Sequence, residues 1–253
     1  MLKYRVIPAL LLDGEGLVKT TRFKHPKYIG DPINAIRIFN DKEVDELMVL
    51  DISASKLKRN PNFELIKKFA GECFMPLSYG GGVTTVEQAR KLFAIGVEKI
   101  AIQSAAIENL DLISSIADQF GSQSVIMSID IKKDWLNKYK AFSSKDMKTL
   151  KLDWMLMVKR AEDAGVGEIL LNSVDRDGTM GGMELDLIKR ASSAISVPLI
   201  AVGGVGGLAD IKSAVASGAN AVAVGAYFVF NGPHRAVLIT YPKYNELEEL
   251  FKS

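Results

Sequence analysis

The sequence has few of the residues that form disulfides or hold metal ions. Among its 253 residues there is one cysteine, Cys73, so an internal disulfide is excluded and nothing indicates an oxidising compartment. Only two histidines accompany this cysteine, which excludes a Cys/His zinc cluster with the usual number of ligands. We expect neither a metal nor a cofactor.

Long apolar runs and an excess of one charge are also missing. No apolar stretch reaches the ~18 residues that a membrane span needs. The segment 1–12 is apolar but carries Lys3 and Arg5, and it lacks the cleavage site of a signal peptide. Lys and Arg number 32 against 30 acidic residues, which gives no electrostatic reason to expect nucleic acid or a membrane as partner. The expected protein is soluble and cytoplasmic.

What the sequence does contain is a regular alternation of short apolar runs and amphipathic stretches. The strand candidates are Arg5–Leu12, Glu46–Ile52, Met75–Tyr79, Lys99–Gln103, Ser124–Ile131, Glu168–Val174, Pro198–Val202 and Ala219–Gly225. Helical patterns lie near 32–43, 62–72, 85–95, 108–119, 152–164, 184–194, 207–216 and 243–252. Eight strands alternating with eight helices predict an α/β fold, the (β/α)8 or TIM barrel. A doubly wound sheet is the alternative, but it normally carries a G-x-G-x-x-G turn after its first strand.

An internal repeat favours the barrel. Three segments recur at an offset of 122 residues: those that begin at Glu46 and Glu168, at Pro76 and Pro198, and at Gly96 and Gly218. The first strand, from Val6, matches the segment from Val125 at an offset of 119. We therefore expect residues 1–253 to form one barrel domain built from two similar half-barrels, at about 1–122 and 123–253.

Glycine-rich segments follow several predicted strands. Active sites of such barrels lie at the carboxyl ends of the strands, and glycine lets backbone N–H groups approach a phosphate closely. Gly82 and Gln103-Ser104 form one candidate phosphate site, and Gly204 with Gly225-Ala226 forms another on the opposite side. Two such sites suit a substrate with a phosphate at each end. The alternative is that the glycines only permit tight turns.

Two long segments follow the first and fifth strands. The first, 13–30, carries Lys19, Arg22, Lys24, His25 and Lys27, and the second, 132–150, is also rich in lysine. Loops between strand and helix usually run ~2–6 residues, so the first segment predicts a mobile lid over an anionic ligand.

Two aspartates stand where acid–base chemistry would take place. Asp130 ends the fifth strand, and Asp177 precedes Gly178 after the sixth. A partly buried carboxyl group can transfer protons near neutral pH, although an aspartate before glycine is also a common turn former. The repeat aligns Asp130 with Leu11, which cannot transfer protons.

The opposite ends of four strands carry charged residues: Arg5, Glu46, Lys99 and Glu168. Two cations and two carboxylates at the floor of a barrel can be a stabilising ion-pair cluster. They can also form a gate on a passage through the apolar interior.

Several motifs together resemble one family over nearly the whole chain. They are Arg5-Val-Ile-Pro, Gly30-Asp-Pro, Gly80-Gly-Gly-Val, Phe120-Gly-Ser-Gln and Gly167-Glu-Ile-Leu-Leu-Asn-Ser-Val-Asp-Arg-Asp-Gly-Thr. They are similar to the cyclase subunit of imidazole glycerol phosphate synthase, a glutamine amidotransferase of histidine biosynthesis. The resemblance implies a half-repeat barrel that receives ammonia from a glutaminase docked on its floor. It also implies a phosphorylated small-molecule ligand, an aminoimidazole-carboxamide ribonucleotide with two phosphates.

The resemblance assigns roles residue by residue. Asp130 matches one of two catalytic aspartates, and Lys19 matches a lysine of the first loop. The phosphate-binding positions are Gly82, Gln103, Ser104, Asp177, Gly178, Gly204, Gly225 and Ala226, and the gate residues are Arg5, Glu46, Lys99 and Glu168. The sequence departs from the pattern at the second catalytic aspartate, where it has Leu11. Gln103-Ser104 and Ala226 also replace the family's usual Asn-Thr and serine.

The segment Leu10-Leu-Leu-Asp-Gly-Glu-Gly-Leu-Val-Lys-Thr is similar to a divergent branch of the family. In that branch the barrel is associated with a glutaminase and a sugar amidotransferase, and it delivers ammonia for amidation of a surface-polysaccharide sugar. The sequence thus predicts this role, with an active synthase that uses Asp13 or Asp51 as the second acid as the alternative. The related phosphoribosyl isomerase, which needs no floor gate, and a non-catalytic scaffold of an amidation complex are further alternatives.

Overall fold

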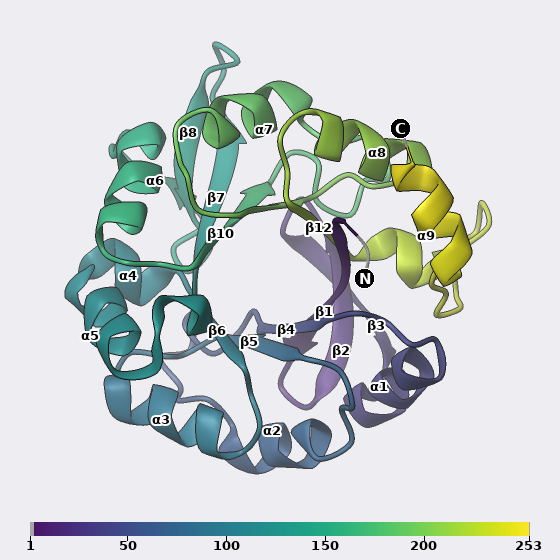
Figure 1. The fold of residues 1–253 in the computed structure, drawn as a ribbon, viewed down its shortest axis with the longest axis horizontal. Coiled ribbons are helices and arrows are strands. Elements are labelled where there is room, and N and C mark those ends of the chain that lie inside the picture. Colours follow the sequence, from purple (N-terminus) through teal and green to yellow (C-terminus); the bar gives the residue numbers. More distant parts are fainter. Residues whose placement is uncertain (1–2, 253) are drawn as a thin grey trace.

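A closed ring of parallel strands forms the centre of the computed structural model, which describes residues 3–252. The strands of the ring are β1 (Arg5–Asp13), β4 (Leu47–Asp51), β5 (Leu77–Gly80), β6 (Lys99–Ile102), β7 (Val125–Lys133), β10 (Glu168–Ser173), β11 (Leu199–Val202) and β12 (Ala221–Val224). Each pairs in parallel with its neighbours, and β12 pairs with β1, with Ala221 opposite Arg5 (Figure 1). The predicted (β/α)8 barrel is confirmed.

Helices surround this ring (Figure 1). They are α1 (Pro32–Asp41), α2 (Phe63–Ala70), α3 (Val86–Ala94), α5 (Asp111–Phe120), α6 (Trp154–Asp163), α7 (Leu185–Ser192), α8 (Leu208–Ala216) and α9 (Tyr244–Phe251), with a short α4 (Ser104–Glu108) and two 3-10 turns, η1 (Ser122–Ser124) and η2 (Ala226–Phe228). Local sequence explains where they begin. Asp31 accepts a hydrogen bond from the Asn34 N–H ahead of Pro32 at the start of α1, and Thr85 and Gln88 form a capping box at α3. Among residues 3–252, every helix is too short or too polar to span a lipid bilayer.

The alternation of side chains along the strands produces two apolar layers. Residues such as Val6, Leu47 and Ile100 point outward and pack against the helices. The residues between them point inward and fill the barrel: Ile7, Ala9, Met48, Ala101, Ile126, Leu170, Ile200, Ala221 and Ala223. The interior is therefore a packed apolar column with one end at the strand starts and the other at the strand ends.

The segment 13–30 was expected to be a loop that forms a mobile lid, and the structure instead shows an antiparallel ribbon. Strand β2 (Gly16–Thr21) pairs with the end of β1, Leu11 opposite Val18, and with β3 (Lys24–Gly30). Leu17 and Val18 are buried and fix the ribbon to the core. The many lysines concealed this strand pattern in the sequence.

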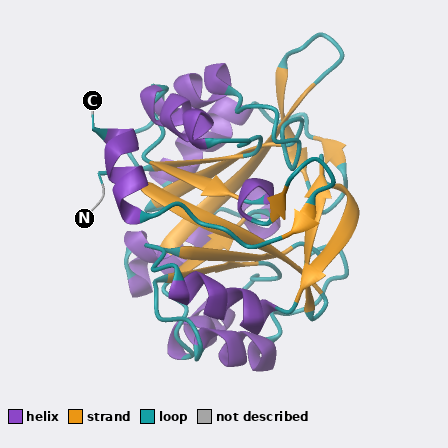
Figure 2. Cartoon of the chain, turned by 90° about the vertical axis from the view of Figure 1, so that its right-hand side faces the viewer, coloured by secondary structure: helices purple, strands orange, loops and turns teal. Residues whose placement is uncertain are grey.

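The second long segment is a ribbon as well. Strands β8 (Tyr139–Ser143) and β9 (Lys148–Thr149) extend the sheet from β7, with Phe142 opposite Asp130. The turn between β7 and β8 projects beyond the ring of helices (Figures 1 and 2), and it exposes Trp135 at its tip. A small ribbon of β13 (Phe230–Asn231) and β14 (Ala236–Val237) follows β12. The long insertions therefore build walls around the carboxyl ends of the strands.

Candidate functional site

The carboxyl ends of all eight barrel strands surround a cavity of about 330 Å³, which we call the mouth cavity. The structure brings to it every residue that the sequence predicted for this end of the barrel. These are Leu11, Lys19, Gly82, Gln103, Ser104, Asp130, Asp177, Gly178, Gly204, Gly225 and Ala226. The predicted positions thus form one continuous lining, whereas the chemical role of each residue stays a prediction.

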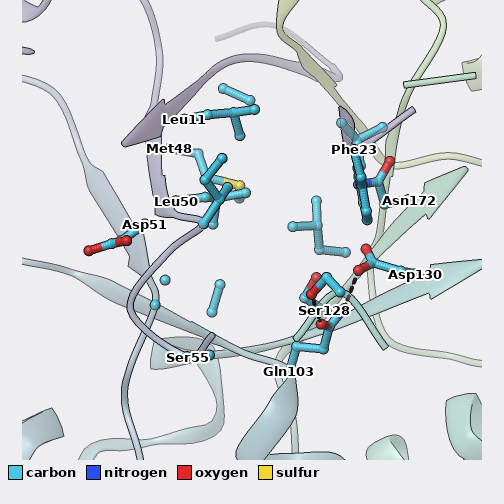
Figure 3. A pocket seen from close by; sticks show the side chains of 18 of the residues that line it. Leu11, Phe23, Met48, Leu50, Asp51, Ser55, Gln103, Ser128, Asp130 and Asn172 are labelled. Atoms are coloured by element: carbon cyan, nitrogen blue, oxygen red, sulfur yellow. Dashed lines mark hydrogen bonds between the residues drawn. The ribbon is translucent and has the colours of Figure 1, made fainter. Parts of the chain in front are cut away.

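Asp130 is the buried carboxyl group of the mouth cavity. It lies near the end of β7 and is only 4% exposed. Burial raises its pKa to about 7, and a hydrogen bond from Gln103 acts against this shift. The Gln103 Nε2 donates to Asp130 Oδ2 at 2.6 Å (Figure 3). A carboxyl group with this pKa can exchange a proton near neutral pH, as acid–base chemistry requires.

Lys19 on β2 is the buried cation of the cavity. Its Nζ donates to the carbonyl oxygen of Ala9, and burial lowers its pKa to about 8. The charge of Asp177 opposes this shift. At Gly225 a Cβ would lie 2.9 Å from Lys19 Nζ, so the glycine leaves the space that the ammonium group occupies.

The wall opposite Asp130 is apolar. Leu11, Met48 and Leu50 gather on one side of the cavity, and Asp130 lies with Ser128 and Asn172 on the other (Figure 3). Leu11 points inward as its strand parity predicts, so the position that the family fills with a carboxylate is occupied by a hydrocarbon side chain.

Neither alternative acid takes the place of Leu11. Asp13 is exposed at the end of β1, beside the turn to β2. Asp51 reaches the cavity rim, but its Oδ1 accepts hydrogen bonds from the backbone N–H groups of Ser53 and Ala54, at 2.9 Å each. Its side chain points away from the centre of the cavity (Figure 3).

One predicted phosphate site is formed around Gly82. A Cβ at this residue would lie 2.6 Å from the Arg59 carbonyl oxygen, so only glycine fits. The sequence analysis missed the cations of this side, Lys56, Lys58 and Arg59, which follow β4 and line the cavity. The sequence Lys56-Leu-Lys-Arg, shortly after the predicted strand that ends at Ile52, could have indicated these cations. The Gln103 side chain donates a hydrogen bond to Asp130, and the phosphate-binding role of this residue stays a prediction.

The opposite phosphate site is joined to the β2–β3 ribbon. Asp177 accepts hydrogen bonds from Thr20 Oγ1 at 2.9 Å and from the Phe23 N–H at 3.2 Å. The Arg22 N–H donates to the Asp177 carbonyl oxygen at 2.9 Å. Burial raises the pKa of Asp177, although these hydrogen bonds oppose the shift. The Asp177 carboxylate therefore holds the ribbon at the cavity. Phe23 of the ribbon, which was not among the predicted site residues, also lines the cavity (Figure 3).

Replacing Gly178 with Ala is expected to destabilise the protein by ~1–3 kcal/mol. Gly178 has a φ of 65°, and a Cβ there would collide with the Thr20 carbonyl oxygen of the ribbon. Urea unfolding measures the loss, with Gly207→Ala as the matched control because Gly207 has extended backbone and nothing within 4 Å of an added Cβ. Equal losses in the two variants would contradict this account of the ribbon contact.

The four charged residues at the floor form a closed ring of alternating charge. Arg5 lies 2.6 Å from Glu46 and 3.0 Å from Glu168, and Lys99 lies 3.3 Å and 3.1 Å from the same two carboxylates. Glu46 also accepts a hydrogen bond from Ser78 Oγ at 3.0 Å. The predicted constellation is therefore present as a geometric unit that covers the floor end of the apolar column.

Metal ligands do not gather anywhere in the part of the chain that the structure describes. Within residues 3–252, His, Cys, Asp and Glu side chains form no group of three or more that could hold a metal ion.

These features define a (β/α)8 barrel with a cavity at one end and a charged ring at the other. The family of histidine biosynthesis proteins matches residues 5–233, and the chain belongs to this family. A relative in Pseudomonas aeruginosa, provisionally named imidazole glycerol phosphate synthase subunit hisF2, is 54% identical over 252 residues, which cover 98% of this chain and 99% of the relative.

Two further relatives extend the comparison. A Leptospira interrogans protein, provisionally named imidazole glycerol phosphate synthase subunit HisF, is 49% identical over 253 residues, 99% of this chain and 100% of the relative. The imidazole glycerol phosphate synthase subunit HisF of Alkaliphilus metalliredigens is 37% identical over 232 residues, 91% of this chain and 92% of the relative. Within its family, the chain is therefore similar to HisF subunits along almost its whole length.

Proposed function

We propose that this chain is a HisF-type synthase subunit that takes ammonia from a glutaminase. The glutaminase docks on the floor, ammonia crosses the barrel, and a phosphorylated ligand in the mouth cavity receives it. One observation carries the proposal: the charged ring, the apolar column and the cavity with Asp130 lie in sequence along one barrel axis. Strand β1 alone runs from Arg5 in the ring through Ile7 and Ala9 to Leu11 in the cavity.

The physical properties of the interior suit neutral ammonia. The segment of strand β1 from Arg5 in the ring to Leu11 in the cavity is ~20 Å long at ~3.3 Å per residue. The side chains that fill the barrel interior, among them Ile126, Leu170 and Ile200, are apolar. An ammonium ion would face a large desolvation cost there, whereas neutral ammonia would not.

The first candidate reaction is the one for which the relatives are named. A bisphosphorylated aminoimidazole-carboxamide ribonucleotide is cleaved with ammonia, and the new imidazole ring closes. Asp130 serves as the acid–base group and Lys19 as the cation beside the reacting centre. The glycine-rich segments around Gly82 and Gly204 bind the two phosphates. The names of the relatives and the near-neutral pKa of Asp130 support this candidate.

The second candidate is delivery of ammonia for amidation of a surface-polysaccharide sugar, with a sugar amidotransferase as an additional partner. Leu11 is the observation that favours it, because ring closure in this family uses a carboxylate at that position. The relatives quoted above at 54% and 49% identity bear the synthase name provisionally, whereas the one at 37% bears it without qualification. The names of the relatives favour ring closure, and the apolar wall with Leu11 favours delivery of ammonia for amidation.

Leu11→Asp decides between the two candidates. We expect the purified chain to turn over the bisphosphorylated substrate slowly with ammonia at high pH, and the variant to do so ~10²–10⁴-fold faster, because it regains an acid–base group opposite Asp130. Product formation is followed by absorbance or chromatography. Leu11→Asn is the matched control, since it is polar and of similar shape but cannot titrate.

Each outcome has a distinct meaning. A gain with Asp and none with Asn supports a cavity that retains the ring-closing substrate. Fast turnover by the unaltered chain would mean that this barrel closes the ring without a carboxylate at position 11. No turnover by any of the three would reject ring closure and leave amidation as the function to test.

A further inference from the structure

The side chain of Gln103 is the middle member of a chain of hydrogen bonds at the mouth cavity. Gln103 follows β6 directly, and its Nε2 donates to Asp130 Oδ2 at 2.6 Å. Its Oε1 accepts from the hydroxyl of Ser144, which follows strand β8 in the inserted ribbon. The three residues come from three different segments and all line the mouth cavity, and Figure 3 shows the contact between Gln103 and Asp130.

The direction of these bonds follows from which atoms can donate. An ionised carboxylate only accepts hydrogen bonds, so it needs the NH2 end of the Gln103 amide. A serine hydroxyl can do either, so the carboxylate sets the direction of the amide, and donation from Ser144 to Oε1 supports the orientation with the NH2 group toward Asp130. If the amide turned over, its oxygen would face the carboxylate and would favour the protonated acid instead.

We propose that Gln103 is a positioning residue, which holds Asp130 in one orientation and stabilises its ionised form, and that Ser144 supports this orientation of the Gln103 amide by donating to its oxygen. The inference rests on the proposed function in one respect, that Asp130 is the acid–base group of the cavity. It assigns the inserted β8 ribbon a role in tuning that group.

The surrounding charges show why such a device is needed. Asp130 is buried, and the Asp177 carboxylate in the loop after β10 adds a second negative charge, so both raise its pKa. Lys19 on β2 interacts with Asp177 and is held by the Ala9 carbonyl oxygen. Lys145, the neighbour of Ser144, is paired with Glu108 at 2.7 Å.

The remaining polar groups beside Asp130 are neutral: Gln103, Ser144 and Asn172, each of which acts to lower its pKa. Of these, Gln103 makes the short contact of 2.6 Å to Oδ2. The ionised form of Asp130 therefore depends on neutral donors, with Gln103 as the main one.

The length of the side chain is also suited to this role. Strands β6 and β7 are neighbours in the sheet, with Ile102 opposite Met127, so Gln103 has to reach along β7 to Asp130. An asparagine would be one methylene shorter, about 1.5 Å. We therefore expect the side chain in Gln103→Asn to be too short for the hydrogen bond to Asp130.

A titration of Asp130 tests the proposal directly. The full chain is labelled with 13C at the aspartate carboxyl carbons, and the Asp130 signal is assigned by its absence from Asp130→Asn. We expect Gln103→Met, which is similar in size but cannot donate, to raise the pKa of Asp130 by about 1–2, the equivalent of one hydrogen bond to a charged group. Ser144→Ala should raise it by a smaller amount, and Ser55→Ala, across the cavity in Figure 3, should leave it unchanged.

An unchanged Asp130 titration in Gln103→Met would overturn the proposal. If Gln103→Met fails to fold, Ser144→Ala tests the other end of the chain of hydrogen bonds. An unaltered Asp130 titration in Ser144→Ala rejects the role assigned to Ser144. The titration needs no substrate, so its result is independent of the proposed reaction. Where turnover is measurable, its pH profile should move upward with the titration, and a shifted titration without any turnover would reject the proposed function alone.

Discussion

Replacing Asp130 with Asn is expected to lower ammonia-dependent turnover by ~10²–10⁴-fold, the usual contribution of a general acid or base. The variant keeps the size of the side chain but removes the group whose pKa lies near neutral pH. Steady-state rates with ammonia in place of glutamine measure the effect on the mouth cavity alone. Asp118→Asn on the exposed surface of α5 is the control. Equal rates in Asp130→Asn and the unaltered chain would contradict the role of Asp130.

The same substitution should stabilise the fold at high pH. In the unfolded chain an aspartate titrates near 3.9, whereas burial raises the pKa of Asp130 to about 7 in the folded protein. Between these values the unfolded state releases a proton that the folded state keeps, so the stability of the unaltered chain falls as pH rises. The full cost, on the order of a few kcal/mol, is present above pH 7.

The Asp130→Asn variant carries no such cost, because an amide does not titrate in this range. Urea unfolding at pH 5 and pH 8 should therefore show that the variant gains stability, relative to the unaltered chain, as the pH is raised. A difference between the two proteins that does not change with pH would contradict the raised pKa. Lost activity together with gained stability is the signature of a residue retained for chemistry.

Replacing Glu46 with Ala is expected to cost ~3–5 kcal/mol of stability, because it breaks a buried ion-pair cluster and leaves Arg5 and Lys99 to share one carboxylate, that of Glu168. Glu46 has a side chain only 3% exposed and pairs with Arg5, Lys99 and Ser78. The free energy of unfolding in urea measures the loss. Glu72→Ala is the control, since its ion pair with Arg37 lies on the surface and is worth ~0–1 kcal/mol.

The position of the ring adds a functional readout to this variant. If the ring admits ammonia, Glu46→Ala should lower the ratio of glutamine-dependent to ammonia-dependent turnover in the presence of the glutaminase. Ammonia added to the solution reaches the mouth cavity directly and serves as the internal reference. A lowered stability with an unchanged ratio would assign the ring to stability alone.

The periodicity of the sequence predicted the barrel because the alternation of inward and outward side chains is visible within each strand alone. The alternation from Arg5 to Leu11 shows which side chains point inward, and it placed Arg5 at the floor and Leu11 in the cavity. Gly81 and Gly82 share positive φ angles with Gly203 and Gly204, their counterparts at an offset of 122. The division into half-barrels at about residue 122 stays a prediction.

The inserted ribbons could not be predicted in the same way. Strands β2 and β8 are stabilised by pairing with β1 and β7, which no local pattern of a lysine-rich segment reveals. The Gln103 side chain accepts a hydrogen bond from Ser144, 41 residues away. A short helix such as α4 (Ser104–Glu108) also has too few residues for a periodic signal. Contacts between distant segments therefore limited the prediction of the site.

The two tryptophans give the protein a natural pair of spectroscopic labels. Trp135 is 88% exposed at the tip of the β7–β8 turn, on the mouth side, whereas Trp154 is 8% exposed at the start of α6. A chain grown with 5-fluorotryptophan should give two fluorine resonances, one sensitive to solvent and one shielded from it. A macromolecule bound over the mouth would move the first resonance, and one bound at the floor would move neither. Trp135 in the ribbon beside the cavity thereby reports at which end of the barrel a macromolecule binds.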